Sequence, residues 1–234
     1  MNGTFTVFRK ELKGFFFSPI AYIVITTFLL ISGWFFFSTF FLYNQAELRN
    51  FFIQLPLIFA FVVPAVTMRL FSEELNSGSF ELLSTLPVTD SGVVLGKFMA
   101  AVAFIGLMLL PTIAYAITAS QLGDLDWGPV LGGYGGALLL AGAYTGIGLF
   151  ASSLTKNQII AFIIGMAGCF ALTVLDRILF FVPEKVLGFF AYLAAATHFE
   201  NIARGIIDTR DLLYFFSLMF VFLYATTLVL REKR

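Results

Sequence analysis

An uninterrupted apolar stretch near the start of the chain, IAYIVITTFLLISGWFFFSTFF at residues 20–41, decides the fold. It carries no charged side chain, and a helix of this length, rising about 1.5 Å per residue, crosses the roughly 30 Å hydrocarbon core of a membrane. Five further stretches repeat the pattern, at residues 51–68, 98–117, 130–154, 159–175 and 212–230. Backbone groups cannot stay unpaired in lipid, and these runs lack the alternation of barrel strands. The sequence therefore predicts an all-α, polytopic membrane protein with six transmembrane helices.

The composition excludes most other classes. Of 234 residues, 59% are apolar and 12% are charged, whereas a soluble domain has roughly 45–50% and 25%. The formal net charge is zero at pH 7, which gives no reason to expect a nucleic-acid partner. The one cysteine, Cys169, can form no internal disulfide and is expected to pack as a small apolar residue. We expect residues 1–234 to form a single transmembrane domain in a lipid bilayer.

The distribution of Lys and Arg predicts the orientation, because positive charge is depleted from translocated segments. With the N-terminus inside, the inner segments hold nine basic residues and the outer segments hold five. The first apolar run is also longer than the core of a signal peptide, which has about 7–15 residues, so it should remain as an anchor. We expect both termini on the cytoplasmic side of the membrane.

Residues 4–17 precede the first span and have the pattern of an amphipathic helix. Phe5, Phe8, Leu12, Phe15 and Phe16 recur at spacings of three and four, while the basic residues of this segment point elsewhere. Such a helix lies in the membrane interface. A Pro after it would then let the chain turn into the membrane. The alternative is a basic flank that only sets topology.

The inner segment between the second and third spans, residues 69–97, has too much pattern for a plain loop. We expect two short helices, with Gly78 ending the first and the second closing before Pro87. The second, at residues 78–86, is too apolar for a free loop and too short to cross the membrane, so it needs a partner. The residues that we expect to contact that partner are Glu73, Glu74, Gly78, Phe80, Glu81, Leu82, Leu83 and Leu86. The alternative is that the carboxylates only keep a loop soluble.

Two other segments carry candidate sites. In the fourth span, Gly132 with Gly136 and Gly142 with Gly146 have the spacing that lets helix backbones approach closely in lipid. We favour tight packing there over a hinge or a subunit contact. The outer segment, residues 176–211, is too long for a turn and too apolar for a free loop, so it should be re-entrant or interfacial. In this segment, His198 is a candidate for a structural hydrogen bond or for sensing substrate or pH. Glu200 and Arg204 are placed to form a pair one turn apart on a helix. Asp208 and Asp211 lie at the start of the last span.

Catalytic and nucleotide-binding patterns are not found in the sequence. Gly92, Gly96 and Lys97 suggest a phosphate-binding loop, but such a loop needs four residues between its glycines and a Ser or Thr after the Lys. We find no pattern for a metal site, and expect no cofactor in this chain and no enzymatic activity of its own. The six apolar stretches also lack ionisable residues of the kind that ion-coupled carriers use. This favours an external source of energy.

The chain resembles the permeases of ABC exporters of the ABC type-2 class. The resemblance rests on Glu73-Glu74 followed by Gly78 and the string FELL at residues 80–83, on FRKEL at residues 8–12 with Ser18-Pro19, and on the outer segment from His198 to Tyr214. Nearly the whole chain is covered. The outer segment is most similar to the subgroup of permeases associated with gliding motility.

This resemblance implies a function. Similar permeases pair as two membrane subunits, identical or different, with two separate ATPase subunits that bind MgATP, and residues 78–86 would be the coupling helix that docks on the ATPase. The chain would then couple ATP hydrolysis by its partner to export across the inner membrane of a bacterium. Two alternatives stay open: a membrane scaffold that transmits mechanical work in an envelope machine, and a carrier driven by an ion gradient. The substrate cannot be derived from the sequence.

Overall fold

The fold is a bundle of helices. The computed structural model describes residues 3–43, 47–79, 89–178, 192–206 and 208–233. All regular structure in these ranges is helical, and its elements are α1 (Gly3–Phe17), α2 (Pro19–Tyr43), α3 (Arg49–Thr67), α4 (Arg69–Ser77), α6 (Asp90–Leu109), the 3-10 turn η1 (Leu110–Thr112), α7 (Ile113–Leu122), α8 (Trp127–Leu154), α9 (Gln158–Ile178), α11 (Ala195–Ala203) and α12 (Thr209–Glu232). Six helical stretches of the described chain are long and apolar enough to cross a membrane. The predicted all-α class and its six spans are confirmed.

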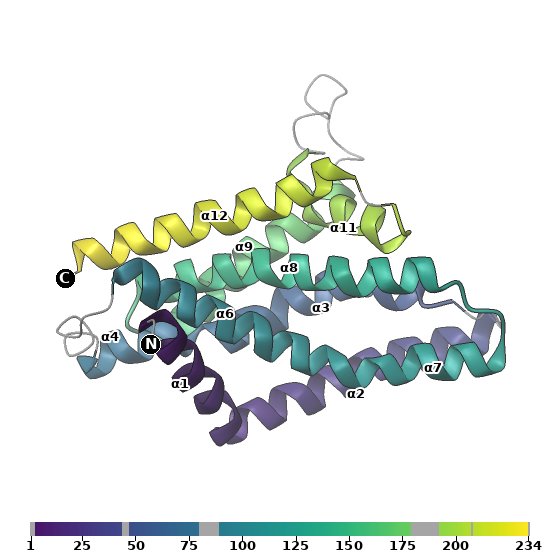
Figure 1. Ribbon diagram of the computed structural model, residues 1–234, viewed down its shortest axis with the longest axis horizontal. Coiled ribbons are helices and arrows are strands. Elements are labelled where there is room, and N and C mark those ends of the chain that lie inside the picture. Colours follow the sequence, from purple (N-terminus) through teal and green to yellow (C-terminus); the bar gives the residue numbers. More distant parts are fainter. Residues whose placement is uncertain (1–2, 44–46, 80–88, 179–191, 207, 234) are drawn as a thin grey trace.

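The central helix of the bundle is α8, which is packed against α3, α9, α11 and α12 (Figure 1). In the most apolar 18-residue stretch of α8, 78% of the residues are buried, compared with 22% in the same length of α9 and 17% in that of α12. Its many glycines suit this position, because they let neighbouring helices approach from several sides. Helices α9 and α12 expose broad apolar faces, as expected of helices that face lipid.

The two ends of the bundle differ. Both chain termini and α4 lie at one end, here called the inner end, whereas the α7–α8 connection and α11 lie at the opposite, outer end (Figure 1). An even number of spans requires this shared location of the termini. The connections at the inner end bring α1, α4 and the start of α6 together.

The amphipathic segment forms α1 and turns into α2 at Ser18. The backbone N–H of Ser18 donates to the Phe15 carbonyl oxygen at 3.1 Å, and Pro19 then occupies the first position of α2, where a missing N–H costs no hydrogen bond. The helix does not rest on lipid alone, because α1 packs along α6. There the Phe15 ring stacks on Phe104, with centroids 4.9 Å apart.

The helix that contains the third span is longer than the uncharged apolar stretch that starts at residue 98. Helix α6 begins at Asp90, and the Thr89 hydroxyl caps it by accepting a hydrogen bond from the Gly92 N–H at 3.2 Å. Lys97 therefore lies two turns inside the helix, where an unpaired ammonium group would be costly in an apolar bundle. The structure shows how that charge is compensated.

Candidate coupling site at the inner end

Lys97 joins three helices at the inner end. Its side chain is 1% exposed, and the ammonium group donates to Glu11 of α1 at 2.9 Å, to Glu74 of α4 at 2.8 Å and to the Leu70 carbonyl oxygen of α4 at 2.8 Å. An ammonium group has three donors, so all of them are used. One side chain of α6 thus holds both α1 and α4, and we call Lys97, Glu11 and Glu74 the inner joint.

The charges of the inner joint are balanced locally. Lys10 lies at its edge, with the ammonium nitrogen 3.9 Å from a carboxylate oxygen of both Glu11 and Glu74. Two ammonium groups therefore face two carboxylates, and the Lys97 nitrogen also lies 5.2 Å from the centre of the Phe71 ring, within range of a cation–π interaction. Burying a charge is tolerated only when it is paired and hydrogen-bonded in this way.

The corner between α3 and α4 is held by Ser152 of α8. The Ser152 hydroxyl accepts hydrogen bonds from the N–H groups of Phe71 and Ser72 at 3.0 and 3.1 Å and donates to the Met68 carbonyl oxygen at 2.7 Å. These backbone groups belong to the helix break, where they lack intrahelical partners. A single hydroxyl of the central helix therefore fixes where α4 starts.

Arg69 fixes the same region to the α1–α2 corner. Its guanidinium group donates to the Ser18 hydroxyl at 3.0 Å and lies over the Phe15 ring, 5.2 Å from the ring centre. Helix α4 thus contacts α1 at its start through Arg69 and near its end through Glu74. Two separated contacts resist rotation of one helix on the other better than a single contact would.

A polar cavity of about 470 Å³ lies beside the inner joint, between α1, α4 and α6. Ser79, the last residue described before residues 80–88, borders it. Gly78 ends α4 in the left-handed conformation, with φ of 72°, which favours glycine. The inner joint therefore holds the helix that leads directly into the segment proposed to dock on an ATPase.

The residues proposed for ATPase docking fall into three groups. Glu73 is exposed on α4, whereas Glu74 turns inward to Lys97 and is already engaged. Gly78 ends α4. The remaining ones, Phe80, Glu81, Leu82, Leu83 and Leu86, lie outside the described residues.

Sequence reasoning missed Lys97 and Glu11 as members of the inner joint. In the sequence, Lys97 belongs to a pattern that falls short of a phosphate-binding loop, and Glu11 lies in the string FRKEL of the amphipathic segment. One signal could have indicated the joint. Lys97 lies seven residues after the start of its helix, and no acidic residue lies one turn before or after it on that helix. Such a side chain needs a partner from another element.

The glycine pairs of α8 lie where two other helices approach. Gly132 and Gly136 face α11, and a Cβ atom added at Gly132 would lie 2.3 Å from the Ile202 carbonyl oxygen. Gly142 and Gly146 face α12 in the same way, against side chains of that helix. Only a hydrogen fits at Gly132, so the approach of α11 requires glycine there.

At the outer end, His198 links α11 to α12. Its Nδ1 atom lies 2.6 Å from an Asp211 carboxylate oxygen, and its Nε2 atom lies 3.1 Å from the Tyr192 carbonyl oxygen. The ring stacks on Tyr214, with centroids 4.1 Å apart, and the Tyr214 hydroxyl donates to the Leu193 carbonyl oxygen at 2.7 Å. His198 and Asp211 are buried, so the cluster ties the end of the outer segment to the last span.

The other outer residues shape the helix ends. Glu200 and Arg204, one turn apart on α11, form an exposed ion pair at 3.2 Å. Asp208 caps α12, because its carboxylate accepts a hydrogen bond from the Arg210 N–H at 3.0 Å. Gly205 lies between the two helices with φ of 83°, a conformation that other residues rarely adopt.

Six apolar helices, of which the glycine-rich α8 is the central one, and a buried ion cluster at one end define an integral membrane domain of the permease type. A family model described as ABC-2 family transporter protein matches residues 6–233, so the chain belongs to this family. None of the curated proteins matches the chain. Family membership confirms the resemblance at the level of the class, and it makes the chain the non-catalytic transmembrane component of an ABC transporter.

Proposed function

We propose that the chain is the permease subunit of an ATP-driven exporter in a bacterial inner membrane, with both termini in the cytoplasm. It pairs with a second permease subunit and with separate ATPase subunits, which bind MgATP. Membership of the ABC-2 family supports the ATPase partner. The location of both termini and α4 at one end of the bundle supports a cytoplasmic inner end (Figure 1), where most Lys and Arg residues lie.

The observation that carries this proposal is the inner joint. Helix α4 leads into residues 78–86, where an ATPase would dock, and Lys97 fixes α4 to α6 and α1. A displacement of the docking segment would therefore move α1 and the start of α6 together instead of bending a free loop. Packed helices transmit such displacements because their interfaces deform little.

ATP binding belongs to the partner in this proposal. Gly92, Gly96 and Lys97 lie inside α6, which has no phosphate-binding loop, and the three donors of Lys97 are occupied. A Cβ atom at Gly96 would lie 2.8 Å from the Thr4 carbonyl oxygen, so this glycine serves the contact between α6 and α1.

The narrower assignment to the gliding-motility subgroup is also a proposal. It rests on the sequence of the outer segment, from His198 to Tyr214. A membrane subunit of a motility machine would use the same ATPase contact to transmit force, with no substrate moved.

Co-purification tests the docking proposal. The chain would be isolated from native membranes in mild detergent with its bound subunits, as wild type and with Phe80→Asp or Leu83→Asp. We expect both variants to insert normally but to lose the ATPase, because a carboxylate in an apolar contact is not compensated. Leu83→Met, which keeps the apolar volume, should retain it. Normal recovery of the ATPase with both Asp variants would contradict the assignment of residues 78–86.

A further inference from the structure

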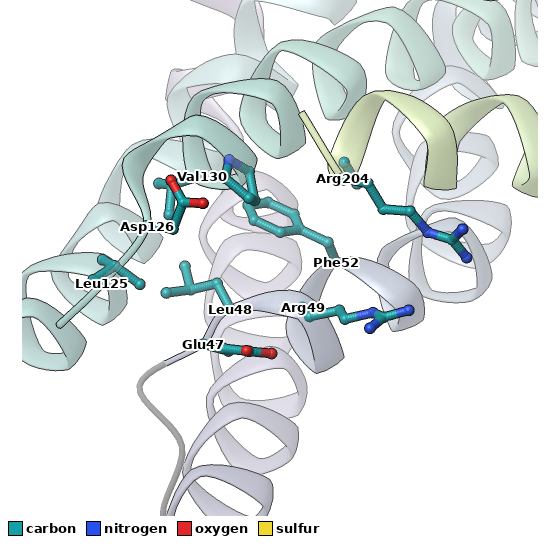
Figure 2. A pocket seen from close by; sticks show the side chains of 10 residues that line it. Glu47, Leu48, Arg49, Phe52, Leu125, Asp126, Val130 and Arg204 are labelled. Atoms are coloured by element: carbon teal, nitrogen blue, oxygen red, sulfur yellow. The ribbon is translucent and has the colours of Figure 1, made fainter. Parts of the chain in front are cut away.

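A second cavity, of about 290 Å³, opens at the outer end, between the starts of α3 and α8 and the end of α11. Its floor is apolar, and includes the buried side chains of Leu48, Phe52 and Val130 (Figure 2). The cavity lies at the outer ends of α3 and α8, two helices long and apolar enough to span a membrane, so we expect it at the level of the lipid headgroups. Trp127, 48% exposed at the start of α8, is of a type enriched at this depth.

Four charged side chains surround this floor in a separated arrangement. Glu47 and Asp126 lie on one side of the cavity, and the guanidinium groups of Arg49 and Arg204 lie on the other (Figure 2). Within the described part of the chain, no ion pair joins the acids of one side to the guanidinium groups of the other, and Arg204 pairs instead with Glu200. All four are exposed, so a ligand can reach them.

The position of Arg49 is unfavourable for the isolated chain. It is the first residue of α3, where the positive end of the helix disfavours a cation. Under the six-span topology proposed above, it also lies on the side of the membrane where Lys and Arg are depleted. No described carboxylate forms an ion pair with it. An anionic group from outside the chain would compensate this charge.

We propose that this cavity binds the headgroup of a phosphatidylethanolamine molecule from the outer leaflet. The phosphate accepts hydrogen bonds from Arg49 and Arg204, whose planar guanidinium groups suit phosphate oxygens. The ammonium group donates to Glu47 and Asp126, and the glycerol and first acyl carbons cover the floor at Phe52. Two acids and two guanidinium groups match a zwitterion, whereas a purely anionic lipid would face the acids without compensation.

The test measures lipid retained by the full-length protein after delipidation and incubation with one defined lipid. The probes are dioleoyl phosphatidylethanolamine and dioleoyl phosphatidylglycerol, counted per protein by native mass spectrometry. We expect about tenfold tighter retention of phosphatidylethanolamine, because one charge-assisted hydrogen bond accounts for about that factor. Glu47→Gln should remove most of this preference, because it removes an acceptor of the ammonium group. Arg49→Gln should instead lower the retention of both lipids, because both carry the phosphate that Arg49 contacts. Arg210→Gln, which changes a charge at the outer end but outside the cavity, should leave it unchanged.

Three results would overturn the proposal. Equal retention of both lipids by the wild type would remove the basis for a zwitterion site. Unchanged retention of phosphatidylethanolamine by Arg49→Gln would show that the phosphate does not bind at this residue. Displacement of the lipid by equimolar glycerophosphoethanolamine would show that a soluble zwitterion, and not a lipid, is the ligand. The readout needs no ATPase and no transport, so these results are independent of the proposed exporter function.

Discussion

Replacing Lys97 by Met should destabilise the protein more than any other single change at the inner end. The methionine fills a similar volume, so the core around Phe71 keeps its packing, but the variant leaves Glu11 and Glu74 facing each other without a buried cation. Their side chains are 16% and 14% exposed, so water compensates them only partly. The Leu70 carbonyl oxygen also loses a donor.

The magnitude follows from the burial of the group. Removing one partner of a buried ion pair costs about 3–5 kcal/mol, whereas replacing all members by neutral residues is often close to neutral. We therefore expect Lys97→Met to lower the free energy of unfolding by about 3 kcal/mol, at the low end because Lys10 stays near both carboxylates. The triple variant Glu11→Gln, Glu74→Gln, Lys97→Met should recover at least half of this loss.

Unfolding of the purified protein by a denaturing detergent, followed by circular dichroism and tryptophan fluorescence, gives the free energies. Lys13→Met is the matched control, because Lys13 is an exposed lysine of α1, and it should change stability by less than about 0.5 kcal/mol. The reasoning is refuted if Lys97→Met behaves like Lys13→Met. It is also refuted if the triple variant is less stable than Lys97→Met, because the uncompensated carboxylates would then not be the cause.

Two further predictions concern the outer end. Gly132→Ala should lower the free energy of unfolding by about 1–3 kcal/mol, since the added Cβ would overlap the Ile202 carbonyl oxygen. Gly135→Ala, whose added Cβ meets nothing within 4 Å, should be neutral or slightly stabilising. Equal melting temperatures of the two variants would contradict the packing argument. Asp211→Asn should lower the free energy of unfolding by about 1–3 kcal/mol, because an amide replaces the carboxylate that contacts the buried His198 ring at 2.6 Å. A melting temperature equal to that of the wild type would show that this contact contributes little.

The parts of the fold that depend on local chemistry could be predicted from the sequence. Each apolar run is long enough to span a membrane, and backbone hydrogen bonding in lipid then leaves only a helix. The break at Ser18–Pro19 and the end of α4 at Gly78 follow from the dihedral angles that these residues favour. Thr89 and Asp208 cap helices for similarly local reasons.

The inner joint could not be predicted, because its members come from three distant segments. The Lys97 ammonium meets a carboxylate 86 residues away at Glu11 and another 23 residues away at Glu74. The sequence shows three charges near the ends of apolar runs, which is the ordinary pattern of membrane topology. Only the packing of α1 along α6, with the approach at Gly96, places these charges together.

Movement of the docking segment should reach the spans through rigid helices, and ATP hydrolysis by the isolated complex in lipid vesicles tests this coupling most directly. Three glycines would be inserted after Pro87, between the docking segment and α6, and a control would carry the same insertion after Asp124 in the outer connection before α8. Flexible residues absorb displacement without transmitting it. We predict that the Pro87 insertion retains the ATPase but loses the stimulation of ATP hydrolysis by the membrane subunit, while the Asp124 insertion keeps it. Equal stimulation in both would contradict mechanical coupling through the inner end.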